Sequence, residues 1–254
     1  MARPPTGVAR NRASAPANRQ LTLELAPSPC FDREDFFVSG SNEKAYAMIE
    51  LWPDWPDSVL LLLGPSGAGK SHLGAIWAAK AKARVLSAAL LAKADREALA
   101  AGPLLVEDVD AIGEAETELF HLVNLMRERG ASLVLTARTP PDVWGLRTAD
   151  LLSRLRLAPC VEIGMPDDAL MRAVLVKLFI DRQLIVDASV VEYAALRLDR
   201  SLGAARGFIA ALDREALSRQ SRITRAMAAD VLRALSDDVD DPVSLGEETG
   251  RSQL

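Results

Sequence analysis

Short apolar runs alternate with segments of helical spacing over residues 31–164. Apolar residues three and four positions apart predict helices at 72–81 and 114–129, and Gly130 is suited to end the second. The continuous apolar runs predict buried strands at 59–63, 84–87, 104–108, 131–136 and 161–163. Strands separated by helices predict an α/β fold, a parallel sheet with helices on both faces.

The pattern becomes entirely helical after residue 164. The sequence Pro-Asp-Asp at 166–168 begins a helix expected to end near residue 181, and Asp187 can cap another that is expected to end near residue 198. Further helices are expected over 203–218 and from the capping residue Thr224 to about 235. We therefore expect an α/β domain at 31–164 followed by a small all-helical domain at 165–235.

The two ends of the chain differ from this middle part. Residues 1–19 hold four arginines and no acid, whereas residues 236–254 hold six acids and one arginine. Neither end can bury a core, so we expect a disordered arm within 1–30 and an acidic disordered tail at 236–254. The formal net charge of −5 leaves the folded part acidic as well, which disfavours a dedicated, sequence-specific DNA-binding domain.

Cysteine usage and hydropathy favour a cytoplasmic protein. Cys30 and Cys160 are the only cysteines and lack metal-ligand spacing, so neither a disulfide framework nor a zinc site is expected. No apolar run reaches the roughly 20 residues that cross a bilayer. The first residues also lack the apolar stretch of a signal peptide.

Residues 64–71 read Gly-Pro-Ser-Gly-Ala-Gly-Lys-Ser, directly after the apolar run 59–63. This is the full P-loop pattern G-x-x-x-x-G-K-[ST], with the preceding strand and following helix that the pattern requires. In such a loop, backbone N–H groups hold phosphate oxygens, the lysine reaches the β- and γ-phosphates, and the hydroxyl binds Mg²⁺. The predicted nucleotide-binding residues are Gly64, Pro65, Ser66, Gly67, Ala68, Gly69, Lys70 and Ser71.

Polar side chains lie at the carboxyl ends of two predicted strands, 104–108 and 131–136. Glu107 and Asp108 stand where a P-loop ATPase places the acids that hold Mg²⁺ and orient water, although an ordinary solvated strand end is the alternative. Asp110 is interpreted as a solvated loop residue. Thr136 either contacts the γ-phosphate or the attacking water as a sensor 1 residue, or bonds locally through its hydroxyl.

Two arginines and one apolar segment have two interpretations each. Arg154, in the leucine-rich stretch 151–157, is either a surface residue or projects at an interface. Arg206 either folds back onto the phosphates or pairs with an acid. The segment 20–25, Gln-Leu-Thr-Leu-Glu-Leu, is either an edge strand or a tethered linear motif that docks in an apolar groove.

Further motifs follow one another in a fixed order over about residues 31–235. They are Phe-Val-Ser-Gly-Ser-Asn at 37–42, Gly-Lys-Ser-His-Leu at 69–73, Glu-Leu-Phe-His-Leu-Val-Asn at 118–124, Leu-Thr at 135–136 and Leu-Ser-Arg-Leu at 152–155. Together they resemble the AAA+ module of the bacterial replication initiator DnaA. The resemblance implies an AAA+ P-loop fold, an αβα sheet domain with a small helical lid, that binds ADP or ATP and Mg²⁺.

Two features narrow the resemblance to the Hda type of DnaA-like protein. The chain ends after the lid helices, where DnaA continues into a helix-turn-helix domain, and residues 20–25 look like the hexapeptide that docks on the replication sliding clamp. The resemblance implies a negative regulator of replication initiation whose partners are the DNA-loaded β clamp and DnaA. The resemblance further implies that such a protein stimulates ATP hydrolysis by DnaA and has weak or no ATPase activity of its own; whether it forms homo-oligomers stays open.

The resemblance also assigns roles to individual residues. Arg154 matches an arginine finger that acts in trans, Arg206 matches the sensor arginine of the lid, and Asn42 is expected near the base. The residues expected in the clamp groove are Gln20, Leu21, Leu23 and Leu25.

The chain departs from the DnaA pattern at two strand ends. Glu107-Asp108 replaces two aspartates, and Ala137-Arg138 replaces Ser-Asp after Thr136, which inverts a charge. Both changes favour a nucleotide held as a structural ligand over a dedicated ATPase. A DnaC-like helicase loader and an autonomous AAA+ ATPase are the alternatives.

Overall fold

The computed structural model describes residues 33–240. The predicted arm, its clamp-binding segment 20–25 and the tail beyond 240 lie outside the described residues. The strands are β1 (Val59–Leu63), β2 (Arg84–Ser87), β3 (Leu104–Glu107), β4 (Leu133–Ala137) and β5 (Cys160–Glu162). The α-helices are α1 (Glu43–Glu50), α2 (Lys70–Ala81), α3 (Arg96–Leu99), α4 (Glu116–Glu128), α5 (Ala149–Leu157), α6 (Asp168–Asp181), α7 (Ala188–Ala195), α8 (Leu202–Arg219) and α9 (Arg225–Asp240).

The strands form one parallel sheet in the order β2-β3-β4-β1-β5. In the register of the central pair, Leu63 of β1 lies opposite Ala137 of β4. β4 separates β1 from β3, so the carboxyl ends of these three strands are neighbours at one edge of the sheet. Ligands bind at this edge in parallel α/β sheets.

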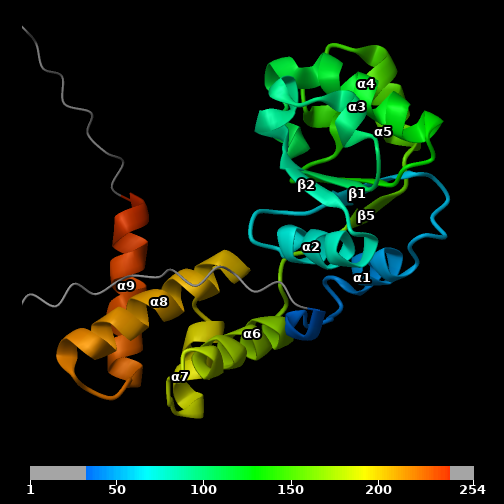
Figure 1. The fold of residues 1–254 in the computed structure, drawn as a ribbon. Helices are drawn as coiled ribbons and strands as arrows, with labels where there is room; N and C mark the ends of the chain where they lie inside the picture. Colours follow the sequence, from blue (N-terminus) through cyan, green and yellow to red (C-terminus); the bar gives the residue numbers. More distant parts are fainter. Residues whose placement is uncertain (1–32, 241–254) are drawn as a thin grey trace, which may run out of the picture. The chain divides into compact units, whose positions relative to one another are not determined.

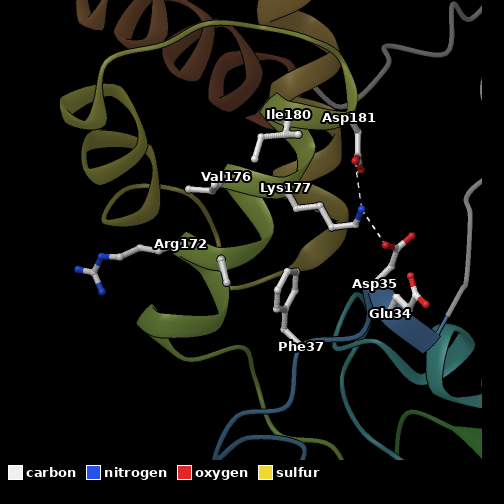
Figure 2. Close-up of a pocket in the computed structure, with 9 residues that line it drawn as sticks. Glu34, Asp35, Phe37, Arg172, Val176, Lys177, Ile180 and Asp181 are labelled. Atoms are coloured by element: carbon white, nitrogen blue, oxygen red, sulfur yellow. Dashed lines mark hydrogen bonds and ion pairs between the residues drawn. The ribbon is translucent and has the colours of Figure 1, made fainter.

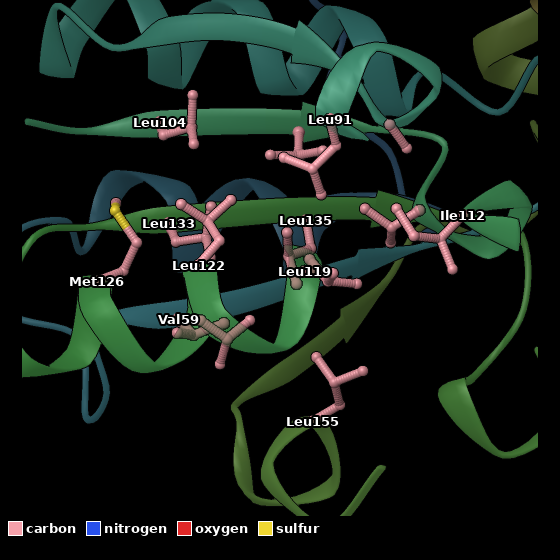
Figure 3. Close-up of a cluster of buried hydrophobic side chains, with 14 of the residues drawn as sticks. Val59, Leu91, Leu104, Ile112, Leu119, Leu122, Met126, Leu133, Leu135 and Leu155 are labelled. Carbon is pink, nitrogen blue, oxygen red and sulfur yellow. The ribbon is translucent and has the colours of Figure 1, made fainter. Parts of the chain in front are cut away.

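Helices cover both faces of this sheet (Figure 1). Leu61 of β1 belongs to the core that contains α4 and α5, whereas Leu60 belongs to the core with α1 and α2. In Figure 3, Leu119 and Leu122 of α4 lie against the first face of the sheet. The strand is continuously apolar because both of its faces are buried.

The helices α6 to α9 share a separate hydrophobic core. Two of them begin at the predicted capping residues Asp187 and Thr224, and α6 begins within the predicted start 166–168, with Asp167 as its cap. Asp167 accepts a hydrogen bond from the N–H of Leu170 at 2.8 Å, and Asp187 accepts one from Ser189 at 2.8 Å. Thr224 accepts one from Met227 at 3.3 Å. Such bonds satisfy N–H groups that a helix leaves unpaired in its first turn.

The last helix is longer than predicted. It continues to Asp240, so the prediction that disordered chain begins at 236 is wrong for residues 236–240. The hydroxyl of Ser236 donates to the carbonyl of Leu232 at 3.0 Å, within the helix. Neither glycine nor proline interrupts the helix before Pro242, and a proline disfavours helical backbone at the residue before it. In contrast, α7 ends at Ala195, before the predicted end near 198.

The first described residues are attached to α6 (Figure 2). Lys177 Nζ lies 2.8 Å from Asp35 Oδ1 and 3.0 Å from Asp181 Oδ1. These side chains border a cavity of about 630 Å³, whose apolar wall includes Phe37 and Ile180. None of the predicted site residues lines this cavity.

Candidate functional site

The loop 64–71 between β1 and α2 depends on its glycines. Gly64, Gly67 and Gly69 have φ angles of 151°, 72° and 112°, which side-chain-bearing residues rarely adopt. A Cβ on Gly67 would lie 2.0 Å from Ser201 Oγ, and one on Gly64 would lie 2.4 Å from the carbonyl oxygen of Ile163. The close approach of neighbouring atoms therefore requires glycine at both positions.

Lys70, the first residue of α2, is a buried cation within this loop. Its Nζ donates to the carbonyl oxygens of Gly64 at 2.7 Å and Pro65 at 3.0 Å. Burial lowers the pKa of Lys70 below its usual 10.5, and nearby acids, with Asp108 foremost, oppose this change. The N-terminus of α2 has no side-chain cap. A buried ammonium beside uncapped backbone N–H groups fits an anion such as a nucleotide phosphate.

The first turn of α8 contacts the same loop. The N–H of Leu202 donates to the carbonyl of Gly67 at 2.9 Å. Arg206 follows one turn later on α8 and is exposed. Its guanidinium forms no ion pair with any side chain of residues 33–237, so pairing with an acid, one of its two interpretations, is not seen in that part of the chain. Its sensor role stays a prediction.

Thr136 forms a hydrogen bond with the backbone at the acidic end of β3. Asp108 follows β3 with a φ of 59°, and its N–H donates to Thr136 Oγ1 at 3.1 Å. Thr136 is buried at the end of β4. The hydroxyl thus makes the local bond that the sequence allowed, and it keeps its proton as a donor. Contact between Thr136 and a phosphate stays a prediction.

Asp110 differs from its interpretation as a solvated residue. Its side chain is 7% exposed, and its Oδ2 lies 2.7 Å from Arg138 Nε. The local sequence does not reveal this pair, because α4 and β4 separate its two members along the chain. They become neighbours because β3 and β4, which precede them, pair in the sheet. The signal that could have suggested it is the unusual arginine just after the end of β4. The charge of Asp110 opposes the lowering of the Lys70 pKa, and the charge of Arg138 adds to it.

Asn42 is buried, and its side-chain amide forms hydrogen bonds with the backbone of nearby residues. Its Nδ2 donates to the carbonyl of Phe37 at 2.9 Å, and its Oδ1 accepts from the N–H of Ser39 at 2.9 Å. Asn42 therefore holds the backbone of residues 37–42 in shape. Phe36, just before this loop, lies edge-on to His72 of α2 with 5.3 Å between ring centres. The place of Asn42 near a base stays a prediction.

Arg154 has contacts separate from those of Lys70. Its guanidinium carbon lies 5.8 Å from the centre of the Phe120 ring on α4. Its carbonyl accepts a hydrogen bond from Arg127 at 3.2 Å, and Arg127 is paired with Asp57 at 2.7 Å. Arg154 is exposed on α5. The helix is thus anchored through its backbone while the guanidinium lies at the surface.

The predicted oxygen donors for Mg²⁺ are Ser71 at the start of α2 and the carboxylates of Glu107 and Asp108, and their role as ligands stays a prediction. Across residues 33–240, no group of three or more His, Cys, Asp or Glu residues could hold a metal ion. A magnesium ion would therefore depend on phosphate oxygens as well as on these residues, which is its usual mode in nucleotide sites. No helix in the described part of the chain is long and apolar enough to span a membrane.

The parallel sheet, the P-loop and the helical cluster define the AAA+ P-loop class of fold, so the predicted α/β fold with a helical lid is confirmed. Domain III of DnaA from Thermotoga maritima matches with a TM-score of 0.70 and 20% identity, over 82% of this chain and 97% of that one. A RuvB variant from Thermotoga maritima matches with a TM-score of 0.61 and 16% identity, over 80% and 71%.

Within this class, the chain is similar to DnaA. AMPPCP-bound DnaA from Aquifex aeolicus matches with a TM-score of 0.66 and 22% identity, over 84% of this chain and 71% of that one. The DnaA chromosomal replication initiator of Enterococcus faecalis is 24% identical over an alignment of 234 residues, which covers 82% of this chain and 52% of that protein. The chain thus spans about half the length of this curated relative. No protein-family model matches. The similarities support a DnaA-like AAA+ module.

Proposed function

We propose that this chain binds ADP or ATP with Mg²⁺ at the P-loop and regulates DnaA negatively, as an Hda-type protein. The observation that carries the nucleotide site is Lys70, whose ammonium is buried inside a glycine-dependent loop. A buried ammonium bonded only to neutral carbonyl oxygens is costly, and a bound phosphate would offset that cost with charge-assisted hydrogen bonds. The AMPPCP-bound DnaA relative supports the same ligand class.

Arg154 is the residue that we propose to act on DnaA. Its guanidinium is exposed on α5, beside Phe120. An arginine from a neighbouring subunit can neutralise charge that develops on a transferred phosphoryl group, an effect worth about 10³–10⁵ in rate for GTPases. In this proposal Arg154 supplies that charge to ATP bound by DnaA, and the chain's own nucleotide serves as a structural ligand.

Residues 20–25 would hold the protein on the sliding clamp. Gln20, Leu21, Leu23 and Leu25 lie outside the described residues, so this part of the proposal depends on the sequence motif alone. A tether to the clamp raises the local concentration of the regulator near replicating DNA.

The arginine is tested by measuring loss of ATP from DnaA in the presence of DNA-loaded clamp. We expect Arg154→Ala to abolish the stimulation, and Arg154→Lys to fail as well because lysine lacks the bidentate fork. Arg156→Ala is the matched control, since Arg156 lies on the same helix, is also exposed, and pairs with Asp142. Stimulation by Arg154→Ala at the wild-type rate would remove Arg154 from the mechanism.

The partners are tested by pull-down with purified clamp, DnaA and replicative helicase. Gln20→Ala combined with Leu23→Ala should abolish clamp retention and leave nucleotide binding unchanged. Retention of the clamp by this variant would contradict the motif. Binding to the helicase instead would favour the helicase-loader alternative, and steady ATP turnover by the chain alone would favour the autonomous ATPase.

A further inference from the structure

Arg138 and Asp110 form an ion pair that the proposed function does not use. Arg138 Nε lies 2.7 Å from Asp110 Oδ2, and the two side chains are 57% and 7% exposed. Asp110 Oδ1 is also buried and has no hydrogen-bond partner among residues 33–240. A buried carboxylate with one unpartnered oxygen is costly without a neutralising cation. Asp110 therefore holds Arg138 in place.

The strand register places Arg138 beside the start of the P-loop. The N–H of Gly64 donates to the carbonyl of Ala137 at 3.2 Å, and Arg138 is the next residue. The carbonyl of the same glycine accepts a hydrogen bond from Lys70 Nζ at 2.7 Å. Lys70 therefore contacts this glycine from inside the loop, and the backbone of Arg138 begins one residue beyond the carbonyl that the glycine binds.

We propose that Arg138 is a nucleotide-selecting residue, whose terminal nitrogens contact the third phosphate of a bound nucleoside triphosphate while Nε stays on Asp110. The inference rests on the proposed nucleotide site. A guanidinium carries five N–H donors in a planar fork, so one edge can bind a carboxylate and another a phosphate. Within residues 33–240, Asp110 is the acid paired with Arg138, and the pair uses Nε.

The position of β4 explains why the third phosphate is selected. β4 lies between β1 and β3, so its end faces the space between the P-loop and Asp108. A triphosphate extends beyond the diphosphate and brings further negative charge. Arg138 should therefore strengthen triphosphate binding much more than diphosphate binding, because only the triphosphate supplies an anion at that end of the site.

The test compares dissociation constants of ADP and AMPPCP by isothermal titration calorimetry on the full chain. We expect Arg138→Ala to weaken AMPPCP about tenfold or more and ADP less than about twofold, the range for loss of a charge-assisted hydrogen bond. Arg156→Ala is the matched control. It removes another exposed arginine from an aspartate pair, and it should change neither constant.

A second variant separates ligand binding from folding. Arg138→Ala leaves Asp110 buried without its partner, so the double variant Arg138→Ala/Asp110→Asn removes both charges. It should show the same selective loss of AMPPCP affinity while its thermal unfolding stays cooperative.

The outcomes distinguish the two proposals. If the folded double variant loses ADP and AMPPCP equally, or loses neither, the selecting role of Arg138 is overturned while the nucleotide site stands. If the wild-type chain binds neither nucleotide, the proposed nucleotide site itself is overturned.

Discussion

The sheet part and the helical part of the molecule differ in what they bury. Among residues 33–237, the polar or charged residues that are buried as whole residues are Asn42, Lys70, His72 and Thr136, and the side chain of Asp110 is buried as well. All of them belong to the sheet part, at or near the P-loop. The buried positions of α6 to α9 are entirely apolar. Because buried polar groups are costly unless they are bonded, their concentration at one edge of the sheet indicates a site, whereas the apolar helical core contributes to stability.

The largest change should come from the apolar helical core. Phe208 of α8 is fully buried there. We expect Phe208→Ala to lower the free energy of unfolding by about 3–5 kcal/mol, because it removes packed apolar volume and leaves a cavity. Chemical denaturation measures this, with Leu217→Ala as control, since Leu217 lies on the same helix but is 71% exposed. A loss below about 1 kcal/mol would contradict the packing of this core.

A substitution at Lys70 should affect nucleotide binding and leave stability unchanged or higher, the opposite of the effect expected at Phe208. Lys70→Met keeps the volume of the side chain but removes its charge, so we expect nucleotide affinity to fall on the order of 100-fold, as for loss of two charge-assisted hydrogen bonds. The free energy of unfolding should be unchanged or higher, because burial disfavours this ammonium in the folded protein. Calorimetric titration and denaturation measure the two effects. Lys93→Met, at an exposed lysine, is the control. A loss of stability in Lys70→Met would contradict the expectation that Lys70 serves binding and not stability.

A substitution at Thr136 tests whether a buried polar residue of the sheet part contributes to stability or to ligand binding. Thr136→Val preserves shape but removes the acceptor of the Asp108 N–H, so we expect the free energy of unfolding to fall by about 1 kcal/mol. AMPPCP affinity, measured in the same variant, decides between the two interpretations of Thr136. Unchanged affinity leaves it a local structural residue, and a selective loss makes it a sensor. Thr139→Val, at an exposed position nearby, should affect neither quantity.

The smallest effect should arise at the start of the helical part. Asp167→Ala removes the cap of α6, which should cost about 1 kcal/mol at neutral pH. The hydrogen bond from the Leu170 N–H lowers the pKa of Asp167 below its usual 3.8, so the folded state favours the charged carboxylate. The stability difference between wild type and variant should therefore be full above that pH and shrink as the pH falls below it.

Denaturation curves recorded between neutral pH and about pH 2.5 measure this difference. Asp54→Ala provides the control, because Asp54 is an exposed loop residue that caps no helix. A difference that persists unchanged at the acidic end would show that the charge of Asp167 is not what stabilises α6.

The features that the sequence predicts most accurately depend on residues that lie close together in the chain. The caps Asp167, Asp187 and Thr224 each bond to an N–H two or three positions later, so the chain itself encodes the start of each helix. The end of α9 was misplaced because acidic residues suggested disorder, although none of them breaks a helix.

The sequence by itself determined the P-loop, the apolar strands and the helix starts, because these depend on backbone preferences and on periodicities that a short segment already contains. Only the tertiary structure decided that Asp110 is buried against Arg138, that Ser201 approaches Gly67 and that Arg154 lies on Phe120. These contacts join segments that are distant in the chain. Their partners are set by the order of the strands and by how the helices pack, which no local pattern specifies.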